Sequence, residues 1–436
     1  MIEGHNSIKI DYGEDPDDDI AIGCGENRDL SMLDVIADLR ERKKTVESGG
    51  INCIPLPFKR FRTEIPGIEQ EQYIVVTAPT KGGKSQFASF VYLYHAIDYA
   101  FAHPDRCSVH VIYFALEESQ MRIKHRYISH LLYQLDHIRI SPTDLRSTDS
   151  DFPLSDGILN LLETPRYKER LAFFDRCVQF ETEDTNPTGI LRVCEEYAKS
   201  VGEYKSIKKK SRGNSQQEVE VFQSYTPYDK KHYKIVFIDH IGLVDLERGM
   251  TLKQSMDKLS EYCVKYLRNR YKFTIVAIQQ QAMESEGLEA IKQKRMMPAV
   301  ATLGDTKYTA RDANLVIGLF DPSFFGLPTF GSGNNKYIIQ DTNNTGLFNY
   351  CRFAQLIRGR DGEQGGICPL FFDGAVCHFE ELPLASDPTI NQYYAKAKQL
   401  KAAKRQKKQQ QNVTNLTLIS LFKFKPKWKK IKFFSL

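Results

Sequence analysis

The sequence predicts an α/β protein in which helices flank a mostly parallel central sheet. Strand-like apolar runs alternate with helical stretches from Gly50 to about Leu384, and this alternation is typical of parallel sheets. A glycine-rich segment, Ala78 to Ser85, joins the first run to a helix-like stretch. Such a segment predicts a phosphate-binding loop, so the chain is expected to bind a nucleotide at one edge of the sheet.

The predicted strands are short runs of β-branched, aliphatic and aromatic residues. The first is Tyr73–Thr77, and residues 140–156 and 206–231 interrupt the alternation that follows. Both interruptions are polar and poor in core residues, so they are expected to be surface insertions. The later strands are predicted at 109–114, 177–180, 235–238, 274–278, 315–319 and 352–357.

The two ends of the chain differ in charge from its centre. Residues 1–29 are acidic and polar and are expected to be disordered, whereas residues 30–49 show apolar side chains at helical spacing. That stretch predicts an amphipathic linker helix, whose apolar stripe could pack on its own domain or on a neighbouring subunit. A basic tail is predicted at 386–436, which leaves 50–385 as the nucleotide-binding domain.

Composition excludes several classes of protein. The chain has 436 residues and 41% hydrophobic content, enough for a large core, and no apolar run of about 18 residues. Its nine cysteines are scattered without a CxxC pair, which argues against a disulfide framework or a zinc site. No signal-peptide pattern begins the sequence, so we expect a cytoplasmic protein without a membrane partner.

The net charge of +5 hides a separation of charge along the chain. Residues 391–436 hold thirteen Lys and Arg and no Asp or Glu, so residues 1–390 carry 5 − 13 = −8. A nucleic-acid surface on the body must therefore be local. The tail interleaves lysine with aromatic residues, which suits stacking on single-stranded bases or contact with an anionic partner, but is also typical of a solubilising tail.

The glycine-rich loop carries the first group of candidate site residues. Lys84 is expected to meet the β- and γ-phosphates of ATP, and Ser85 to bind Mg²⁺. The alternative is a chance Gly/Lys-rich turn before a helix. The predicted nucleotide-binding residues are Ala78, Pro79, Thr80, Lys81, Gly82, Gly83, Lys84 and Ser85.

Five further residues, in four motifs, follow predicted strands. Glu117 could activate a water molecule, or only cap a helix, and Asp239 could hold Mg²⁺, or only form a turn. Gln280 could hydrogen-bond a γ-phosphate, or only be a polar loop residue. Arg358 and Arg360 follow the last apolar strand, where they could reach a phosphate or merely form a charged turn.

The order of these motifs resembles the ATPase domain of DnaB-type replicative helicases, ring-forming members of the RecA-like P-loop ATPases. The matching segments span about residues 50–381 and read APTKGGKS, FALEES, IVFIDHIGLV, VAIQQQ, MPAVATLGDTKYTARDANLVIGLF and LIRGRDGEQGG. The resemblance implies that Glu117 is the catalytic base, Asp239 the Walker B carboxylate and Gln280 the residue coupling γ-phosphate to DNA loops. Arg360 would be an arginine finger offered to the next subunit.

The resemblance also implies partners. It implies a hexameric ring that hydrolyses ATP with Mg²⁺, moves 5′ to 3′ on single-stranded DNA and unwinds duplex at a replication fork. Its channel loops would match residues 282–298 and 246–254. On composition alone, residues 282–298 could be a solvated charged loop, and residues 246–254 are a second candidate loop. The predicted DNA-binding residues are Lys292, Lys294, Arg295, Arg248 and Lys253.

The sequence departs from the family in places. Ala115 and Glu118 replace the usual Ser and Met, residues 311–314 read RDAN instead of an acidic run, and Arg358 replaces Lys. No helical collar or zinc-binding primase module precedes the linker, so no primase or loader contact is implied, and a phage-type protein is expected. A RecA/RadA-like recombination ATPase and a non-motor P-loop ATPase switch are the alternatives.

Overall fold

The structure is a computed structural model that describes residues 31–210, 218–282, 287, 296–333, 335–360 and 365–423. Side chains are described in these ranges except at 208–210, 218–220 and 407–423. The chain forms two compact units. The first contains the residues up to Asp321 together with Arg352–Glu381, and the second contains Pro322–Cys351 and the residues from Leu382 onward.

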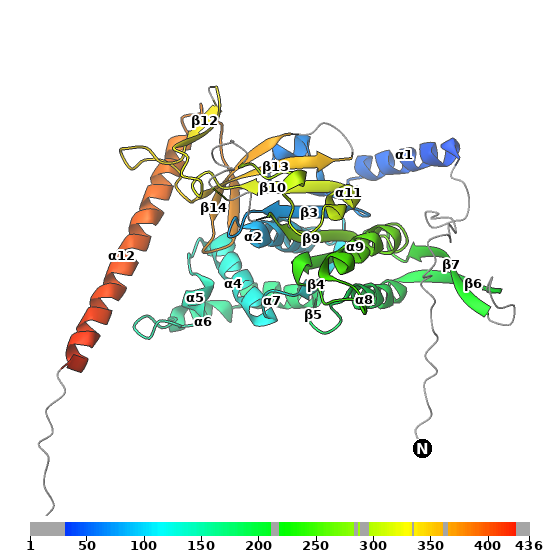
Figure 1. The fold of residues 1–436 in the computed structure, drawn as a ribbon, viewed down its shortest axis with the longest axis horizontal. Helices are drawn as coiled ribbons and strands as arrows, with labels where there is room; N and C mark the ends of the chain where they lie inside the picture. Colours follow the sequence, from blue (N-terminus) through cyan, green and yellow to red (C-terminus); the bar gives the residue numbers. More distant parts are fainter. Residues whose placement is uncertain are drawn as a thin grey trace, which may run out of the picture. The chain divides into compact units, whose positions relative to one another are not determined.

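A nine-stranded sheet forms the centre of the first unit (Figure 1), in the order β15-β14-β13-β10-β3-β9-β8-β4-β5. The six strands from β10 to β5 are parallel, whereas β13 runs antiparallel to β10 and β15 antiparallel to β14. The predicted α/β class with a mostly parallel sheet is therefore confirmed. The strands are β3 (Tyr73–Ala78), β4 (Ser108–Ala115), β5 (Val178–Glu181), β8 (His232–Asp239), β9 (Thr274–Gln280), β10 (Leu315–Phe320), β13 (Cys351–Gly359), β14 (Ile367–Asp373) and β15 (His378–Glu381).

Helices connect the parallel strands, as the crossover between parallel strands requires, and one further helix precedes the first strand. They are α1 (Met32–Glu47), α2 (Lys84–Ala88), α3 (His95–Ala102), α4 (Gln120–Asp136), α5 (Pro142–Leu145), α6 (Asp156–Leu162), α7 (Pro165–Cys177), α8 (Pro187–Ser200), α9 (Leu252–Tyr262) and α11 (Tyr308–Asp312). Two π-helical segments, η2 (Ser89–Tyr94) and η4 (Cys263–Arg268), continue α2 and α9, and short 3₁₀ turns are η1 (Phe61–Thr63), η3 (Ile241–Leu243) and η6 (Val300–Thr302).

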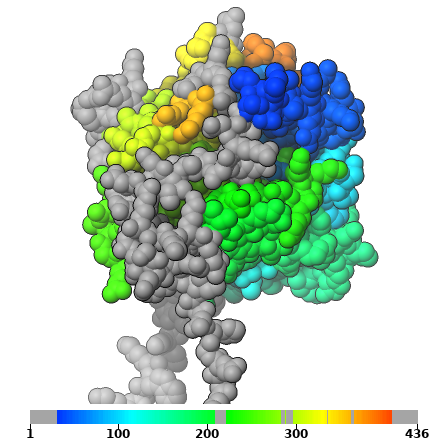
Figure 2. All heavy atoms as spheres, turned by 90° about the vertical axis from the view of Figure 1, so that its right-hand side faces the viewer, coloured from blue at the N-terminus to red at the C-terminus, as the bar shows by residue number. Residues whose placement is uncertain are grey.

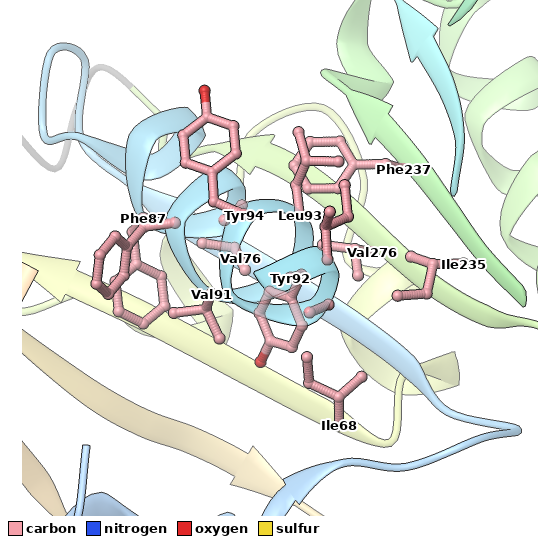
Figure 3. Packing of buried hydrophobic residues seen from close by; sticks show 14 of the residues in the cluster. Ile68, Val76, Phe87, Val91, Tyr92, Leu93, Tyr94, Ile235, Phe237 and Val276 are labelled. Carbon is pink, nitrogen blue, oxygen red and sulfur yellow. The ribbon is translucent and has the colours of Figure 1, made fainter. Parts of the chain in front are cut away.

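The sheet is buried on both faces. Successive strand residues point to opposite sides, so each strand contributes side chains to two cores. Val76 and Phe237 pack on one face with Phe87 and Val91 of the helix that follows β3 (Figure 3). Their strand neighbours pack on the opposite face in a second core. That second core contains Val75, Val236, Ile238, Met256, Leu259 and Leu267, so α9 and η4 cover it.

The predicted linker segment is helical as α1, which begins with a capping box between Ser31 and Asp34. The helix lies on the surface (Figure 2), and none of its residues is buried. Met32, Leu33 and Leu39 are 74%, 76% and 60% exposed. The apolar stripe predicted from the sequence therefore exists, and in this chain it is open to solvent.

The two predicted insertions contain secondary structure of their own. Residues 140–156 include α5 and lead into α6, and the second insertion forms an antiparallel ribbon of β6 (Gly202–Lys210) and β7 (Glu218–Pro227). The ribbon is more than a surface loop, because Tyr225 is buried in the core beside Tyr271. A further small sheet pairs β1 (Ile54–Pro55) with β2 (Gly67–Ile68).

The second unit contains the hairpin of β11 (Thr329–Ser332) and β12 (Asn335–Ile338) and the long helix α12 (Ile390–Lys423). The hydroxyl of Tyr337 donates to the carbonyl of Pro383 at 2.8 Å, which joins the two chain segments of this unit. Within the described part of the chain, no helix combines the length and the apolar character needed to cross a membrane.

Candidate active site

The loop after β3 has the backbone form of a phosphate cradle. Gly83 has φ +92°, a conformation that L side chains rarely adopt, and it immediately precedes the helix that begins at Lys84. At Gly82 a Cβ atom would lie only 2.8 Å from the Cβ of Ala78 and 2.9 Å from the carbonyl oxygen of Pro79. The chain can therefore close tightly here only with glycine, and the loop leads directly into the N-terminus of a helix, where free backbone N–H groups favour anions.

Ser85 connects this loop to the end of β8. Its hydroxyl donates to Oδ1 of Asp239 at 2.9 Å, and the hydroxyl of Tyr113 in β4 donates to Oδ2 at 3.1 Å. Burial raises the pKa of Asp239 to about 6, opposed by the hydrogen bond from Ser85 and assisted by the negative charge of Glu117. A divalent cation would favour the ionised carboxylate, and a hydroxyl beside a carboxylate is the donor set that Mg²⁺ prefers.

Glu117 lies beside Asp239 at the carboxyl end of the parallel strands. Its backbone N–H donates to the carbonyl of Asp239 at 3.2 Å, and that of Leu116 donates to the same oxygen at 3.1 Å. The side chain of Glu117 is exposed. A carboxylate fixed by its backbone but open to solvent is positioned to accept a proton from water.

Gln280, at the end of β9, contacts the residue that follows Asp239. Its amide Nε2 lies 3.3 Å from Nε2 of His240. Burial lowers the pKa of His240, opposed by the negative charge of Glu117 and assisted by the positive charge of Lys84, so the neutral ring is favoured and can accept this hydrogen bond. Gln280 therefore lies at the same sheet edge as Asp239, as predicted.

The other two glutamines of the QQQ run are structural. Gln279 donates to the carbonyls of Gly304 and Thr306 at 2.7 and 2.8 Å, and Gln281 donates to the hydroxyl of Thr77 at 2.7 Å. Both are buried. Since strand residues alternate in direction, only the middle glutamine of the run faces the predicted site.

The two predicted arginines contact the backbone near the end of α11. Nη1 of Arg358 donates to the carbonyl of Ala310 at 3.1 Å. Arg360 donates from Nη2 to the carbonyl of Asp312 at 2.9 Å and from Nε to that of Ala313 at 3.2 Å. These cations therefore satisfy carbonyls at the C-terminal end of a helix, where positive charge is favourable.

The strand register places both arginines away from the phosphate loop of their own chain. Gly359 pairs with Leu315, which pairs with Ile74 near the start of β3. The loop follows Ala78 at the other end of that strand. Because β13 is antiparallel to β10, the carboxyl end of β13 lies where the parallel strands begin, away from the phosphate loop.

Arg352 is a site residue that the sequence analysis did not identify. It is 5% exposed, and its Nε donates to the carbonyl of Gly82 in the phosphate loop at 2.8 Å. Its Nη1 also lies 2.9 Å from Oδ2 of Asp321, and its guanidinium stacks 4.7 Å from the ring centre of Phe372. The signal available in the sequence was a cation inside the apolar run CRFAQLI.

The predicted DNA-binding residues are only partly described. Lys292, Lys294 and Arg295 lie outside the described residues. Arg248 and Lys253 are exposed, the first in a turn after β8 and the second in the first turn of α9. Their role stays a prediction.

Solved structures share this fold. A structure described as a DnaB-like replicative helicase and its interactions with primase aligns with a TM-score of 0.54 and 14% identity, over 82% of this chain and 68% of that chain. A second structure, described as an ATPase domain, aligns with a TM-score of 0.57 and 14% identity, over 82% of this chain and all of that chain. The chain therefore shares the fold of these structures, an α/β fold with a mostly parallel central sheet flanked by helices. No protein-family profile matches the chain, and no curated protein is significantly similar to it.

Proposed function

We propose that this protein is an ATP-dependent DNA helicase of the DnaB-like type, which translocates on single-stranded DNA and unwinds duplex during replication. The observation that carries the proposal is the hydrogen bond of 2.9 Å between Ser85 and Asp239, formed beside Glu117. It joins the phosphate loop to the end of β8, an arrangement that would hold Mg²⁺ and ATP, on a fold shared with a structure described as a DnaB-like replicative helicase and with a solved ATPase domain.

The residues present fit ATP and Mg²⁺. The tight glycine turn supplies backbone donors for phosphate, and Lys84 adds a cation that is 7% exposed at the start of the helix. Ser85 and Asp239 would hold Mg²⁺, which supplies charge neutralisation on the phosphates when bound. Arg352 would keep the cradle in shape by holding the carbonyl of Gly82.

Hydrolysis would use two more residues of this edge. Glu117 would accept a proton from the attacking water, because its exposed carboxylate is fixed next to Asp239. Gln280 would hydrogen-bond the γ-phosphate after leaving His240. Because Gln279 ties the same strand to residues 304–306, a shift of Gln280 would be passed to the segment that follows the predicted DNA loop.

Catalysis would occur between subunits of a homo-oligomer, which we propose to be a hexameric ring. Arg360 lies at the sheet edge opposite the phosphate loop of its own chain, so it could serve only the nucleotide of a neighbour. Single-stranded DNA would be held by Lys292, Lys294 and Arg295, with Arg248 and Lys253 on the second loop.

Mixed oligomers test this arrangement. Arg360→Ala and Glu117→Gln subunits should each assemble and bind ATP but turn over slowly, since an arginine finger contributes on the order of 10³-fold or more in rate. A mixture forms some interfaces with both Glu117 and Arg360 intact, so DNA-stimulated ATPase should partly recover. Full turnover by Arg360→Ala alone would reject the role of this residue.

Particle images with a non-hydrolysable ATP analogue and single-stranded DNA separate the remaining candidates. A closed ring or lockwasher supports the helicase, whereas a long filament supports a RecA/RadA-like recombinase. ATPase activity that DNA does not stimulate would instead support a non-motor switch. A strand-displacement assay on a forked duplex then measures unwinding directly.

A further inference from the structure

The first turns of helix α12 are packed on one side, and the residues that follow on that side are cations. Ile390, Tyr394 and Ala397 are 4%, 7% and 0% exposed, and their spacing places them on one side of the helix. The hydroxyl of Tyr394 accepts a hydrogen bond from the backbone N–H of Ile338 at 3.1 Å. The first turns of the 34-residue helix are thus anchored within the second unit (Figure 1).

Lys401 is the last anchor on this face in the described side chains. Its Nζ donates to Oδ1 of Asn344 at 2.9 Å and lies 3.5 Å from the ring centre of Phe348. Lys404 and Arg405 follow at three and four residues, so they continue the same side of the helix one turn further. Both are exposed, and so the packing face ends in cations that face solvent.

The positive charge of this part of α12 is not neutralised by residues of the stretch itself. Residues 391–406 contain five Lys and Arg and no acidic residue. Among the side chains that the structure describes, none forms an ion pair with Lys398, Lys404 or Arg405. Like charges three or four residues apart destabilise a helix. Burial lowers the pKa of Lys401, and the charge of Arg405 lowers it further.

We propose that α12 is a nucleic-acid-binding arm that contacts the phosphate backbone without reading sequence. The cations lie along one side of a helix, and the row from Lys398 to Arg405 extends over about 10 Å at a rise of about 1.5 Å per residue. Duplex DNA carries one charge per about 1.7 Å, so several phosphates face a row of this length. The inference rests on the proposed function, which supplies DNA as the substrate.

Residues 395–406 of α12, whose side chains the structure describes, have a composition that favours nucleic acid over a lipid surface. Residues 395–406 contain one large apolar side chain, Leu400. A helix that lies in a membrane interface needs an apolar face opposite its charged one. An acidic polypeptide is the other candidate partner, and residues 1–29 of this chain carry nine Asp and Glu against two Lys and Arg.

A pair of matched variants tests the arm. Lys404→Gln/Arg405→Gln removes one Lys and one Arg from α12, and Lys168→Gln/Arg176→Gln removes the same pair from exposed positions of α7. Both change the net charge equally. Binding of the full chain to fluorescent 30-nucleotide single strands and 30-base-pair duplexes is measured by anisotropy, with and without nucleotide, from 50 to 300 mM salt.

The α12 variant should lose about tenfold in affinity, and its slope of log affinity against log salt should fall in magnitude by about 1 to 2. The loss should be the same without nucleotide, because the arm does not belong to the ATP site. The α7 variant should match wild type. Equal affinities and slopes for the two variants would overturn the arm while leaving the helicase proposal intact, whereas a wild-type protein that binds neither DNA would overturn both. The proposed arm would also be overturned if the α12 variant lost affinity only for anionic vesicles, or only for a peptide of residues 1–29, and bound DNA like wild type.

Discussion

Arg352 of β13 contacts both the phosphate loop and Asp321, which follows β10. We therefore expect a strong energetic coupling between Arg352 and Asp321. The guanidinium and the carboxylate of Asp321 lie 2.9 Å apart, with side chains only 6% and 11% exposed. Removing one partner of a buried ion pair leaves an uncompensated charge, which costs about 3 to 5 kcal/mol. Arg352→Met should therefore lower the free energy of unfolding by that amount.

A double-mutant cycle isolates the pair from the other contacts of Arg352. Asp321→Asn removes the charge of the carboxylate while keeping its shape, and the double variant Arg352→Met/Asp321→Asn contains no buried charge at this position. The double variant should therefore be more stable than the sum of the two single losses predicts, by about 3 kcal/mol. Urea denaturation followed by circular dichroism measures the unfolding free energies of the wild type and the three variants.

Nucleotide affinity provides the functional readout of the same cycle. Arg352 also holds the carbonyl of Gly82, so Arg352→Met should weaken binding of a fluorescent ATP analogue. Asp321→Asn should weaken it less, because the bond to Gly82 remains. Additive unfolding free energies, or equal nucleotide affinity in Arg352→Met and wild type, would refute the reasoning.

Three further outcomes are expected. Lys84→Ala should lose both ATP binding and hydrolysis, whereas Glu117→Gln should keep ATP binding and lose turnover. Equilibrium binding and a phosphate-release assay measure the two properties. Near wild-type turnover in Glu117→Gln would show that Glu117 is not the catalytic base. Burial lowers the pKa of Lys234 to about 7, below an unfolded value of about 10.4. The folded state therefore binds fewer protons, and stability rises by about 1.4 kcal/mol per unit between pH 7 and about 10. Lys234→Met should lack this rise in denaturation curves, and an unchanged pH profile would contradict the assignment. Neutralising Lys292, Lys294 and Arg295 together should reduce the slope of log affinity against log salt for single-stranded DNA and leave basal ATPase activity unchanged. An unchanged slope would show that these residues do not contact phosphate.

The sheet could be predicted because its strands are local patterns. Each of the predicted runs overlaps an observed strand, since a buried parallel strand needs a continuous apolar run. The ribbon of β6 and β7 could not be predicted, because most of its residues are polar and only a few aromatic side chains anchor it, Tyr225 fully and Tyr204 and Phe222 partly buried. Tyr225 is buried there by contacts with Tyr271, which is distant in sequence, and with the Nζ of Lys234, nine residues away, at 2.8 Å.

The candidate site divides in the same way. Asp239, Glu117 and Gln280 follow strands that end at one edge of the sheet, so their order in the sequence was enough to bring them together. Arg352 was missed because a cation in an apolar run is recognised as functional only when its partners are known. Its partner Asp321 is 31 residues away, and the loop carbonyl that it holds belongs to Gly82.

The direction of β13 determines how the site can be completed. In an all-parallel sheet, the residues after every strand would converge on the phosphate loop, and one chain could supply all the catalytic groups. Here β13 runs antiparallel to β10, so Arg360 leaves the sheet at the edge where β3 begins. In this chain its guanidinium is held by the carbonyls of Asp312 and Ala313. An arginine that acts on ATP from this position must leave those carbonyls and reach a second chain, so each catalytic interface would be assembled only when two subunits meet. That requirement provides a physical route for coupling hydrolysis to movement between neighbours.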